Sequence, residues 1–448
     1  MLDVSMKKIA RILGKETALD SRVDRISTDP RDIDGKTLYI PLKGERFDGH
    51  DFIARALEKG AAGALSERPY EDGRVICVGS TLEALGILGM ARRDEVDPLV
   101  VGLTGSVGKT TTKDMTALVL GCRYRTHKTA GNFNNEIGLP KTLLALEKEH
   151  EAAVIEMGMS HKGEISRLTR LAKPDIALIT NIGSAHIEYL GSREGIRDAK
   201  LEIAEGLPEG GTLIINGDEP LLLEKRDLLR EKGYRVLTFG FSEGCDYRAE
   251  EIREEEESVS FTLRGVSFHI PLAGRHNIAN ALAASAAGDQ AGVPLADAAK
   301  ALSSFAPASA MRQSVKKTGG YTLIIDCYNA GPESMHASFQ VAKNMKTEGR
   351  KIAVLGTMRE LGDKAPGYHR TAGLEASEIF DRVITLGEGS PWYRDGAPEA
   401  VEAPKVDDIA PMLLDTARPG DLILFKGSRL NYLEKAAEAF EKAVEPRL

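Results

Sequence analysis

A glycine-rich loop after a short apolar run constrains the fold of this chain more than any other feature. The loop reads Thr104-Gly-Ser-Val-Gly-Lys-Thr-Thr, and the run Leu99–Leu103 before it predicts a buried strand. Gly105 and Gly108 allow the backbone to turn sharply and to bring its N–H groups close to an anion. The segment Thr111–Leu120 has helical spacing, so strand, loop and helix follow one another as in a phosphate-binding loop.

The side chains of this loop suit a nucleoside triphosphate. Lys109 can reach the outer phosphates, and Thr110 can offer its hydroxyl to Mg²⁺. The phosphates would lie at the positive end of the following helix. The strict spacing G-x-x-x-x-G-K-T is not met, because Leu103 stands where the first glycine is expected. A plain glycine-rich turn between a strand and a helix is the alternative interpretation.

Length, charge and cysteine content limit the class of protein. A chain of 448 residues is too long for one hydrophobic core. The formal charge of −8 and the isoelectric point of about 5.8 argue against a general polyanion-binding surface, so a phosphate site must be local. The four cysteines form no C-x-x-C pair, and neither a signal core nor a run of ~20 apolar residues occurs. We therefore expect a cytoplasmic protein, monomeric, with no nucleic-acid or membrane partner.

Apolar runs divide the chain into three blocks. Asp97-Pro98 is a predicted linker, because proline ends the helix before it, and Ala306-Pro-Ala-Ser is a second predicted boundary. The predicted domains are residues 1–97, 98–308 and 309–448. In the second and third blocks, helical segments separate most of the short apolar runs, which predicts parallel α/β sheets. The predicted strands are Leu99–Leu103, Ala153–Ile155, Ile176–Thr180, Leu213–Ile215, Arg235–Phe239, Thr322–Ile325, Lys351–Leu355, Arg382–Leu386 and Leu422–Phe425.

Two neighbouring segments of the second block depart from this rhythm. Ser258–Leu272 alternates apolar and polar residues around Arg264-Gly265, which predicts a β-hairpin. The acidic run Glu250–Glu257 before it is predicted to be a solvated surface loop.

Polar residues that end parallel strands are candidate ligands, because such sheets bind ligands beyond the carboxyl ends of their strands. Glu156 ends the strand Ala153–Ile155 and suits Mg²⁺, a hard cation that takes oxygen ligands. A surface glutamate is the alternative. His186 follows the strand Ile176–Thr180, where a lone histidine is usually structural or exposed.

Two segments rich in asparagine can also be interpreted in alternative ways. Gly131-Asn-Phe-Asn-Asn-Glu-Ile-Gly is either a turn or a polar loop that reaches over the γ-phosphate. Gly274-Arg-His-Asn-Ile-Ala-Asn opens a helix, where Asn277 could act as the cap and Asn280 could face a purine edge.

The third block contains two polar segments at strand ends. Asp326-Cys-Tyr-Asn follows one strand, and Lys426-Gly-Ser-Arg follows another. Two cations at a strand end suggest carboxylate recognition, because arginine is suited to bidentate contact. A solvated rim is the alternative.

Together these segments resemble the Mur ligases, over nearly the whole chain and in the same order. The segments that carry the resemblance are Thr104-Gly-Ser-Val-Gly-Lys-Thr-Thr, Gly131-Asn-Phe-Asn-Asn-Glu-Ile-Gly-Leu-Pro, Glu156-Met-Gly, Asn181-Ile-Gly-Ser-Ala-His and Gly274-Arg-His-Asn-Ile-Ala-Asn. Within the family, the branch that adds D-alanyl-D-alanine is the most similar. Its cues are the Ser-Val of the loop, Asp326-Cys-Tyr-Asn-Ala, Arg359-Glu-Leu-Gly and Lys426-Gly-Ser-Arg.

The resemblance implies a UDP-sugar-binding domain, a central ATPase and a Rossmann-like C-terminal domain. It implies an ATP-dependent ligase that joins D-alanyl-D-alanine to UDP-N-acetylmuramoyl-tripeptide through an acyl phosphate, in peptidoglycan synthesis. Two Mg²⁺ ions are expected. Arg312 would reach the phosphates from the third domain, which predicts hinge closure. The resemblance implies that the catalytic residues are Lys109, Lys200, His186 and Arg312.

Further site residues follow from the same resemblance. Those implied for ATP are Gly105, Ser106, Val107, Gly108, Lys109, Thr110, Thr111, Asn277, Asn280, Arg312 and Asp326. Those implied for Mg²⁺ are Thr110, Glu156, His186 and Lys200, the last as a carbamate, which would turn a cation into an anionic oxygen ligand. Those implied for the UDP substrate are Ser27, Thr28, Lys43, Arg46, Phe47, His50, Asn132, Asn134 and Asn135. Those implied for the dipeptide are Tyr328, Asn329, Lys426, Ser428 and Arg429.

Four positions depart from the usual pattern of the family. Pro30 stands where serine is usual, Ala310 where glycine is common, Gly331 for asparagine or serine, and Thr357 for aspartate. They affect the uridine and dipeptide pockets more than the reaction. Two alternatives stay open: a sister ligase that adds a single amino acid, and a silent paralogue that binds the UDP-muramoyl peptide or ATP without catalysis.

Overall fold

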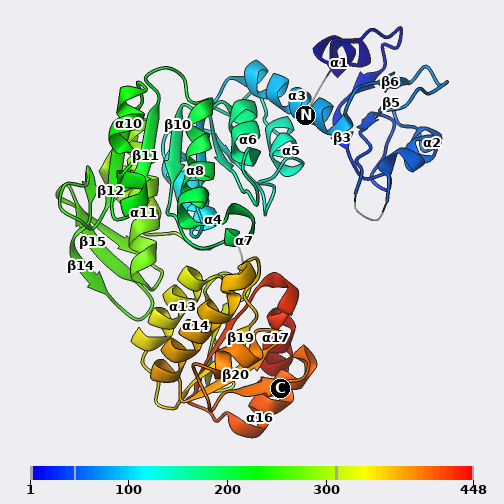
Figure 1. The fold of residues 1–448 in the computed structure, drawn as a ribbon. Coiled ribbons are helices and arrows are strands. Elements are labelled where there is room, and N and C mark those ends of the chain that lie inside the picture. Colours follow the sequence, from blue (N-terminus) through cyan, green and yellow to red (C-terminus); the bar gives the residue numbers. More distant parts are fainter. Residues whose placement is uncertain (1–3, 45–46, 308–310, 446–448) are drawn as a thin grey trace.

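The computed structural model describes residues 4–44, 47–307 and 311–445 of the chain. These residues form three α/β domains, which Figure 1 draws in blue, in cyan to yellow-green, and in yellow to red. The expected three-domain architecture with parallel sheets is therefore confirmed. The second predicted boundary, between residues 308 and 309, lies outside the described residues, so the limits of the three domains stay predictions.

The middle domain is built on a seven-stranded sheet whose strands all run parallel, in the order β13-β12-β11-β10-β7-β9-β8. β7 (Leu99–Thr104) lies between β9 (Ala152–Glu156) and β10 (Ile176–Ile179). Successive strands therefore lie on opposite sides of β7, and this reversal opens a crevice at its carboxyl end. The remaining strands are β8 (Thr126–Lys128), β11 (Thr212–Asn216), β12 (Arg235–Gly240) and β13 (Tyr247–Arg248).

Helices cover both faces of this sheet, which explains why its strands are apolar runs. Successive side chains of a strand point to opposite faces, so Val100 and Val101 belong to different apolar clusters. α4 (Lys109–Leu120) and α11 (Arg275–Gln290) pack on the Val101 face. The helices on the Val100 face include α5 (Gly138–Leu144), α6 (Glu164–Ala172) and α8 (Arg193–Leu201).

A three-stranded antiparallel sheet extends the middle domain. β15 (Val259–Leu263) and β16 (Val266–Ile270) form the predicted hairpin, and the turn residues Arg264 and Gly265 have φ angles of 48° and 79°, as a tight two-residue turn requires. The prediction of a loop over the acidic run is wrong. Its first part forms β14 (Glu250–Glu254), an edge strand that pairs with β15 while its glutamates stay exposed.

The N-terminal domain has a smaller parallel sheet of β3 (Arg25–Ser27), β4 (Thr37–Tyr39), β5 (Gly63–Ser66) and β6 (Val75–Cys77). Its last helix, α3 (Thr81–Val96), leads into the middle domain (Figure 1). Two buried arginines of α3 bind that domain. Arg92 donates to the Leu146 carbonyl at 2.8 Å, and Arg93 to the Ala172 carbonyl at 3.2 Å. α3 therefore holds the N-terminal sheet to the middle domain.

The C-terminal domain has a six-stranded sheet in the order β17-β18-β22-β19-β20-β21. Four of its strands, β18 (Tyr321–Asp326), β19 (Lys351–Gly356), β20 (Arg382–Leu386) and β22 (Leu422–Lys426), match the predicted runs. The sequence analysis missed β17 (Ser314–Thr318) and β21 (Val401–Ala403), because both are polar edge strands. The main helices are α13 (Pro332–Asn344), α14 (Ala365–Ile379), α16 (Val406–Thr416) and α17 (Leu433–Val444).

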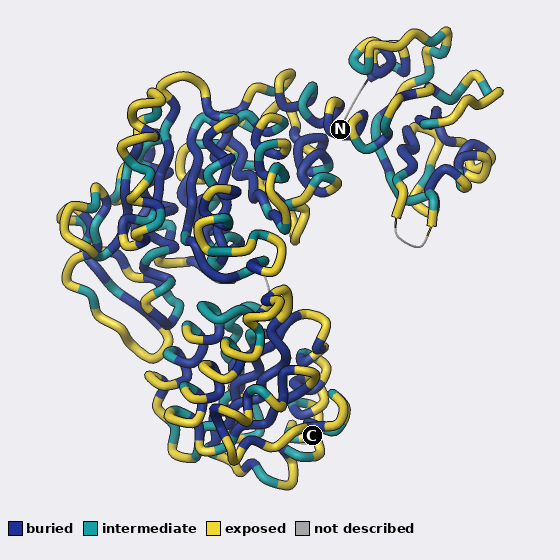
Figure 2. Tube along the Cα trace, in the orientation of Figure 1, coloured by how far each residue is buried: buried dark blue, intermediate teal, exposed yellow. Residues whose placement is uncertain are grey.

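Buried residues follow the sheets of the two larger domains (Figure 2). One apolar cluster crosses the junction between these domains, since it contains Ile182 and Ile187 as well as Met335, Met358 and Leu361.

Within the described ranges, no helix is both long and apolar enough to cross a membrane. The shorter helices and strands are β1 (Val4–Ser5), α1 (Met6–Ile12), β2 (Arg22–Val23), α2 (Ile53–Glu58), α7 (Ile187–Leu190), α9 (Pro220–Leu223), α10 (Arg226–Glu231), α12 (Leu295–Leu302) and α15 (Ser390–Arg394).

Candidate active site

The glycine-rich loop lies at the carboxyl end of β7, and two of its glycines are required by close neighbours. A Cβ on Gly105 would overlap the hydroxyl of Thr180. Gly108 has a left-handed φ of 81°, and a Cβ there would lie 2.5 Å from Oδ1 of Asn280. The loop therefore fits between β10 and α11 only with glycine at both positions.

Residues after β10 hold the loop in place. The hydroxyl of Thr180 donates to the Val107 carbonyl at 2.7 Å, and Oδ1 of Asn181 accepts from the Val107 amide at 2.9 Å. The Gly183 amide donates to the hydroxyl of Ser106 at 2.8 Å. Neither Thr180 nor Asn181 was among the predicted site residues, although their position at a strand end was a usable signal.

Lys109 and Thr110 begin α4 beside the carboxylate of Glu156. Thr110 Oγ1 donates to Glu156 Oε2 at 3.0 Å, and Asn134 Nδ2 donates to the other oxygen at 2.8 Å. Lys109 Nζ donates to the Gly105 carbonyl at 2.8 Å and has no ion pair among the described residues. Burial lowers the pKa of Lys109, and the nearby charge of Arg312 lowers it further against the opposing effect of Glu156.

The oxygen donors at this point suit a magnesium ion. The hydroxyl of Thr110 and the carboxylate of Glu156 are hard ligands in contact with each other, and Glu156 is only 2% exposed. In the described part of the chain, no three His, Cys, Asp or Glu side chains gather as a metal site. The protein therefore offers a partial ligand set of the kind that nucleotide phosphates and water complete.

A cavity of about 580 Å³ surrounds this point and is lined mainly by the middle and C-terminal domains, with Leu82 of α3 from the N-terminal domain at its edge. It brings together most of the residues that the sequence analysis assigned to nucleotide and metal, together with some of those assigned to the substrates. These residues are Ser106, Val107, Gly108, Lys109, Thr110, Thr111, Asn134, Asn135, Glu156, His186, Asn277, Asn280, Arg312, Asp326, Tyr328, Asn329 and Lys426.

Asn277 and Asn280 lie side by side on the first turns of α11. Asn280 accepts from the hydroxyl of Thr112 at 3.1 Å and donates to Asn277 at 3.2 Å. Asn277 donates in turn to the Ala273 carbonyl at 2.8 Å. The prediction that Asn277 caps the helix is wrong, because α11 starts at Arg275 and its cap residue lies before that.

Arg312 enters the cavity from the C-terminal domain. Its guanidinium lies 4.1 Å above the ring of Tyr328, and its charge acts on Lys109. The next residue, Gln313, accepts from His276 at 2.9 Å and from Asn277 at 3.3 Å. The sequence analysis missed Gln313, which joins the C-terminal domain to α11 beside the phosphate loop.

The buried Lys426 at the end of β22 forms an ion pair with the half-buried Asp326 at the end of β18. Lys426 Nζ lies 2.8 Å from Asp326 Oδ2, which also accepts from the hydroxyl of Ser338 at 2.6 Å. Burial alone would raise the pKa of Asp326, but the charge and hydrogen bond of Lys426 hold this pKa below its ordinary value. Lys426 also donates to the Asn329 carbonyl at 2.8 Å, so its amine has two partners among the described residues.

Lys200 lies on α8 and is 2% exposed. No described residue forms a hydrogen bond or ion pair with its amine. Burial, with a smaller effect of the charge of Lys109, lowers the pKa of Lys200 well below its ordinary value. Burial of this kind favours the neutral amine over the charged ammonium.

His186 lines the cavity but also contacts the C-terminal domain. Its Nδ1 lies 2.5 Å from Oε2 of Glu360. This close contact with His186 holds the pKa of Glu360 below its ordinary value. A second contact of the same kind lies nearby, where Ser184 donates to Glu333 at 2.8 Å. Neither glutamate was among the predicted site residues, although Glu360 belongs to the segment Arg359-Glu-Leu-Gly that carries part of the resemblance.

The residues assigned to UDP in the N-terminal domain lie away from this cavity. Thr28 accepts from Lys141 of α5 at 2.7 Å, and the hydroxyl of Ser27 binds the backbone of Asp29. Both ring nitrogens of His50 are engaged, with Asp48 and with the Glu67 amide. Lys43 lies 3.4 Å from Glu67 and Phe47 is 62% exposed, whereas Arg46 lies outside the described residues.

The remaining predicted site residues lie in different surroundings. Asn132 is exposed, and Asn135 accepts from the first amides of α5, as a turn-forming asparagine does. Arg429 lies 3.2 Å from Glu434, and the buried hydroxyl of Ser428 has no partner among the described residues. Of the positions that depart from the family pattern, Gly331 lines the cavity and Ala310 lies outside the described residues.

Family models for three parts of Mur ligases match the chain: "Mur ligase family, catalytic domain" over residues 22–90, "Mur ligase middle domain" over 103–288, and "Mur ligase, glutamate ligase domain" over 311–429. A UDP-N-acetylmuramoyl-tripeptide--D-alanyl-D-alanine ligase of Bacillus subtilis is 44% identical over 97% of this chain and 98% of its own length. The Escherichia coli ligase of the same name is 36% identical over 99% of both chains.

Solved structures agree with these matches. A crystal structure of MurF from Acinetobacter baumannii has a TM-score of 0.92 and 32% identity over 99% of both chains. The MurF ligase of Thermotoga maritima in complex with ADP has a TM-score of 0.85 and 30% identity, over 95% of this chain and 98% of that one. The similarity thus extends over all three domains.

Replacing Gly105 by alanine is expected to weaken nucleotide binding by at least tenfold, about 1.4 kcal/mol, because the new methyl group overlaps the Thr180 hydroxyl that holds the loop. Calorimetric titration with ADP measures the effect. Gly73→Ala is the matched control, since a Cβ there meets nothing within 4 Å. Equal affinity of the Gly105→Ala variant and the wild type would contradict the tight fit of the loop.

The variant Lys426→Met is expected to lower the free energy of unfolding by about 1–3 kcal/mol at neutral pH, because the half-buried carboxylate of Asp326 loses its cation. In the wild type, the lowered pKa of Asp326 contributes stability above its unfolded pKa, and this is lost as pH falls through the folded pKa. In Lys426→Met the pKa of Asp326 rises, so the difference in thermal midpoint between the wild type and this variant should shrink from pH 7 toward pH 4. A difference that stays constant with pH would contradict the contribution of the ion pair. The double variant Asp326→Asn with Lys426→Met should recover part of the lost thermal midpoint.

Proposed function

The chain belongs to the Mur ligase family, and on that premise we propose that it joins D-alanyl-D-alanine to UDP-N-acetylmuramoyl-tripeptide at the expense of ATP. The observation that carries this proposal is the end-to-end similarity to ligases of that name, at 44% identity over 97% of the chain. The product is the peptidoglycan precursor, and the proposed compartment is the cytoplasm. The proposed oligomeric state is a monomer.

The reaction begins with the activation of a carboxylate, which is a poor electrophile by itself. The terminal carboxylate of the tripeptide attacks the γ-phosphorus of ATP in line and forms an acyl phosphate and ADP. Lys109 and the loop amides offset the charge that develops on the phosphoryl oxygens. Mg²⁺, when bound, neutralises phosphate charge, and Thr110 with Glu156 would hold it.

The second step is attack by the amine of D-alanyl-D-alanine on the acyl carbon. A C–N bond forms, the C–O bond to phosphate breaks, and inorganic phosphate leaves with the electron pair and takes up the proton that the amine loses. The step needs no side-chain nucleophile. The cavity between the two domains lets the C-terminal domain present the amine while it excludes water from the acyl phosphate.

Roles for the other cavity residues follow from their positions. Asn277 and Asn280 lie beside Gly108 and are proposed to face the adenine end of the nucleotide. Asp326 is proposed to bind the ribose. Arg312 lies close enough to act on Lys109, and it is proposed to contact the phosphates when the domains close.

The two other substrates are proposed to bind on either side of the nucleotide. Tyr328 and Asn329 line the cavity on the C-terminal side and suit the dipeptide, with Lys426, Ser428 and Arg429 nearby in sequence. The UDP group is assigned to the N-terminal domain, and the muramoyl peptide would extend past the asparagine loop. The proposed residues for it are Ser27, Thr28, Lys43, Arg46, Phe47, His50, Asn132, Asn134 and Asn135.

Lys200 is proposed to act as a carbamate. A neutral amine reacts with carbon dioxide, and the burial of Lys200 together with the charge of Lys109 favours the neutral form. The carbamate would carry a negative charge near Lys109 and add oxygen ligands that the described residues lack. With His186, it would serve a second Mg²⁺.

Purified protein with MgATP is expected to release ADP only when both UDP-N-acetylmuramoyl-tripeptide and D-alanyl-D-alanine are present. A coupled assay measures ADP, and mass spectrometry identifies the pentapeptide product. Turnover with single amino acids would indicate a sister ligase, and binding without ADP release would indicate a silent paralogue. In the same assay, unchanged turnover by Arg312→Ala would contradict the role of Arg312.

Depletion of carbon dioxide is expected to lower the turnover of the wild type, and added bicarbonate to restore it. After exposure to ¹³CO₂, a carbamate carbon resonance should appear in the wild type and be missing in Lys200→Met. Since an unpartnered buried amine costs folding free energy, Lys200→Met should melt at a higher temperature than the wild type without carbon dioxide. A carbamate signal that persists in the variant would contradict the assignment.

A further inference from the structure

The side chain of Gln313 fastens the first described turn of the C-terminal domain to the start of α11. Gln313 Nε2 donates to the Ala273 carbonyl at 3.0 Å. Its Oε1 accepts from His276 at 2.9 Å and from Asn277 at 3.3 Å. A carbonyl oxygen can only accept, so the amide nitrogen of Gln313 must face Ala273 and the amide oxygen must face the two donors. The side chain is therefore held in one orientation by three hydrogen bonds across the domain junction.

The backbone of Gln313 also has an unusual conformation. Its φ is 50°, in the left-handed region that side chains other than glycine rarely occupy. Such a conformation persists only where the surrounding structure enforces it. The turn leads directly into β17, which begins at Ser314 and pairs with β18. The turn is thus held by α11 of the middle domain on one side and by the C-terminal sheet on the other.

Arg312, the residue directly before Gln313, is the group whose position this turn fixes. Its guanidinium lies 4.1 Å above the ring of Tyr328, and the residue lines the cavity. Within the described ranges, Arg312 forms no ion pair, so its charge is left for an anionic ligand. A long side chain loses rotamer freedom when it binds, and a backbone that already holds it near the ligand reduces this cost.

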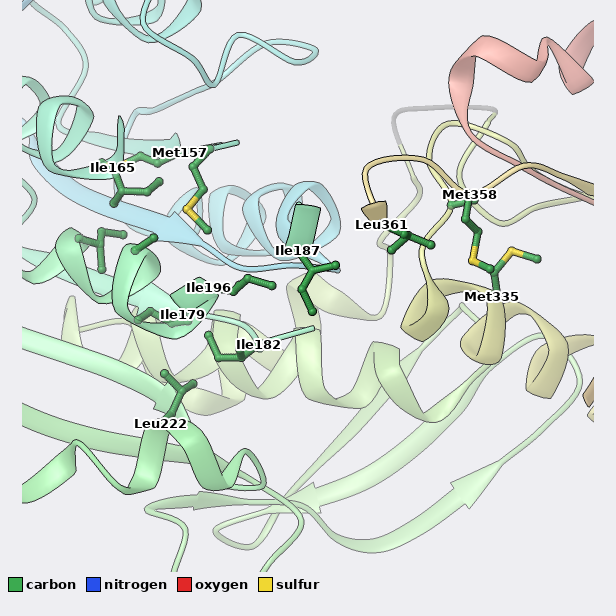
Figure 3. Packing of buried hydrophobic residues seen from close by; sticks show 14 of the residues in the cluster. Met157, Ile165, Ile179, Ile182, Ile187, Ile196, Leu222, Met335, Met358 and Leu361 are labelled. Atoms are coloured by element: carbon green, nitrogen blue, oxygen red, sulfur yellow. The ribbon is translucent and has the colours of Figure 1, made fainter. Parts of the chain in front are cut away.

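Apolar packing holds the same two domains together without Gln313. Figure 3 shows Ile187 of the middle domain near Leu361 and Met358 of the C-terminal domain, and all three belong to one buried apolar cluster. Burial of apolar surface stabilises this junction whether or not the amide of residue 313 is present. Loss of the Gln313 side chain is therefore expected to release the turn before β17 while the domains stay docked.

We propose that Gln313 is a positioning residue that holds Arg312 in the cavity by fastening the turn before β17 to the start of α11. Gln313 acts through Arg312, which is placed beside the phosphate loop only when the C-terminal domain is docked on α11. The inference rests on the proposed function, since it is there that Arg312 contacts the phosphates.

A double-mutant cycle with the non-hydrolysable nucleotide MgAMP-PNP tests this role in the full chain without turnover. Calorimetric titration is expected to show about tenfold weaker binding for Gln313→Ala, an equal or larger loss for Arg312→Ala, and no further loss in the double variant, because residues that act through one another do not contribute additively. Gln313→Gly should lose as much affinity as Gln313→Ala, since glycine adopts the same φ without strain but also lacks the amide.

Gln340→Ala is the matched control for these variants. Gln340 is a half-buried glutamine of the same domain, and its amide donates to Glu375 at 3.0 Å away from the junction. This variant is expected to bind MgAMP-PNP as the wild type does. Wild-type affinity in Gln313→Ala or Gln313→Gly would overturn the inference, and so would losses that multiply in the double variant.

Turnover provides the second readout. Gln313→Ala should lower kcat by about tenfold while the KM values for the UDP substrate and the dipeptide stay within about twofold, and the double variant should turn over no more slowly than Arg312→Ala. A wild-type kcat in Gln313→Ala would contradict the role of Gln313. If the wild type binds MgAMP-PNP but releases no ADP from ATP with both substrates present, the proposed function fails, and the affinity cycle still decides whether Gln313 acts through Arg312.

Discussion

The anchoring of the glycine-rich loop to the end of β10 is the interaction on which the rest of the site depends. The Val107 peptide group is held by Thr180 and Asn181, and Gly105 leaves no room for a side chain between loop and strand. With its backbone held in this way, the loop places the start of α4 at the crevice beside β7, where successive strands change from one side of the sheet to the other. Lys109 and Thr110 then reach the phosphate site without any further adjustment, because both belong to the first turn of that helix.

Uncompensated positive charge is concentrated at this crevice in a chain whose formal charge is −8. Lys109 binds only carbonyl oxygens, and the guanidinium of Arg312 lies over an aromatic ring. Both arrangements cost free energy, since cations shielded from water lose hydration. A triphosphate supplies the missing negative charge, so the cavity is prepared for a polyanion before one arrives.

The C-terminal domain completes the site through a small number of polar contacts. Gln313 joins α11, Glu333 reaches Ser184, and Glu360 holds His186. All three contacts end on segments that directly follow or support the phosphate loop. The packing of the two domains and the preparation of the nucleotide site are therefore coupled by geometry, and an apolar cluster that crosses the junction stabilises the same arrangement.

The sequence by itself determined the local features of this protein. Apolar runs predicted the strands, Gly105 and Gly108 predicted the loop, and Arg264-Gly265 predicted the hairpin, because periodicity and glycine geometry act over a few neighbouring residues. Only the tertiary structure decided that the acidic run forms an edge strand, that Asp326 neutralises Lys426, and that Glu360 faces His186. Such pairs are set by how distant segments pack, and polar side chains far apart in the sequence carry no local signal of the partner that they will meet.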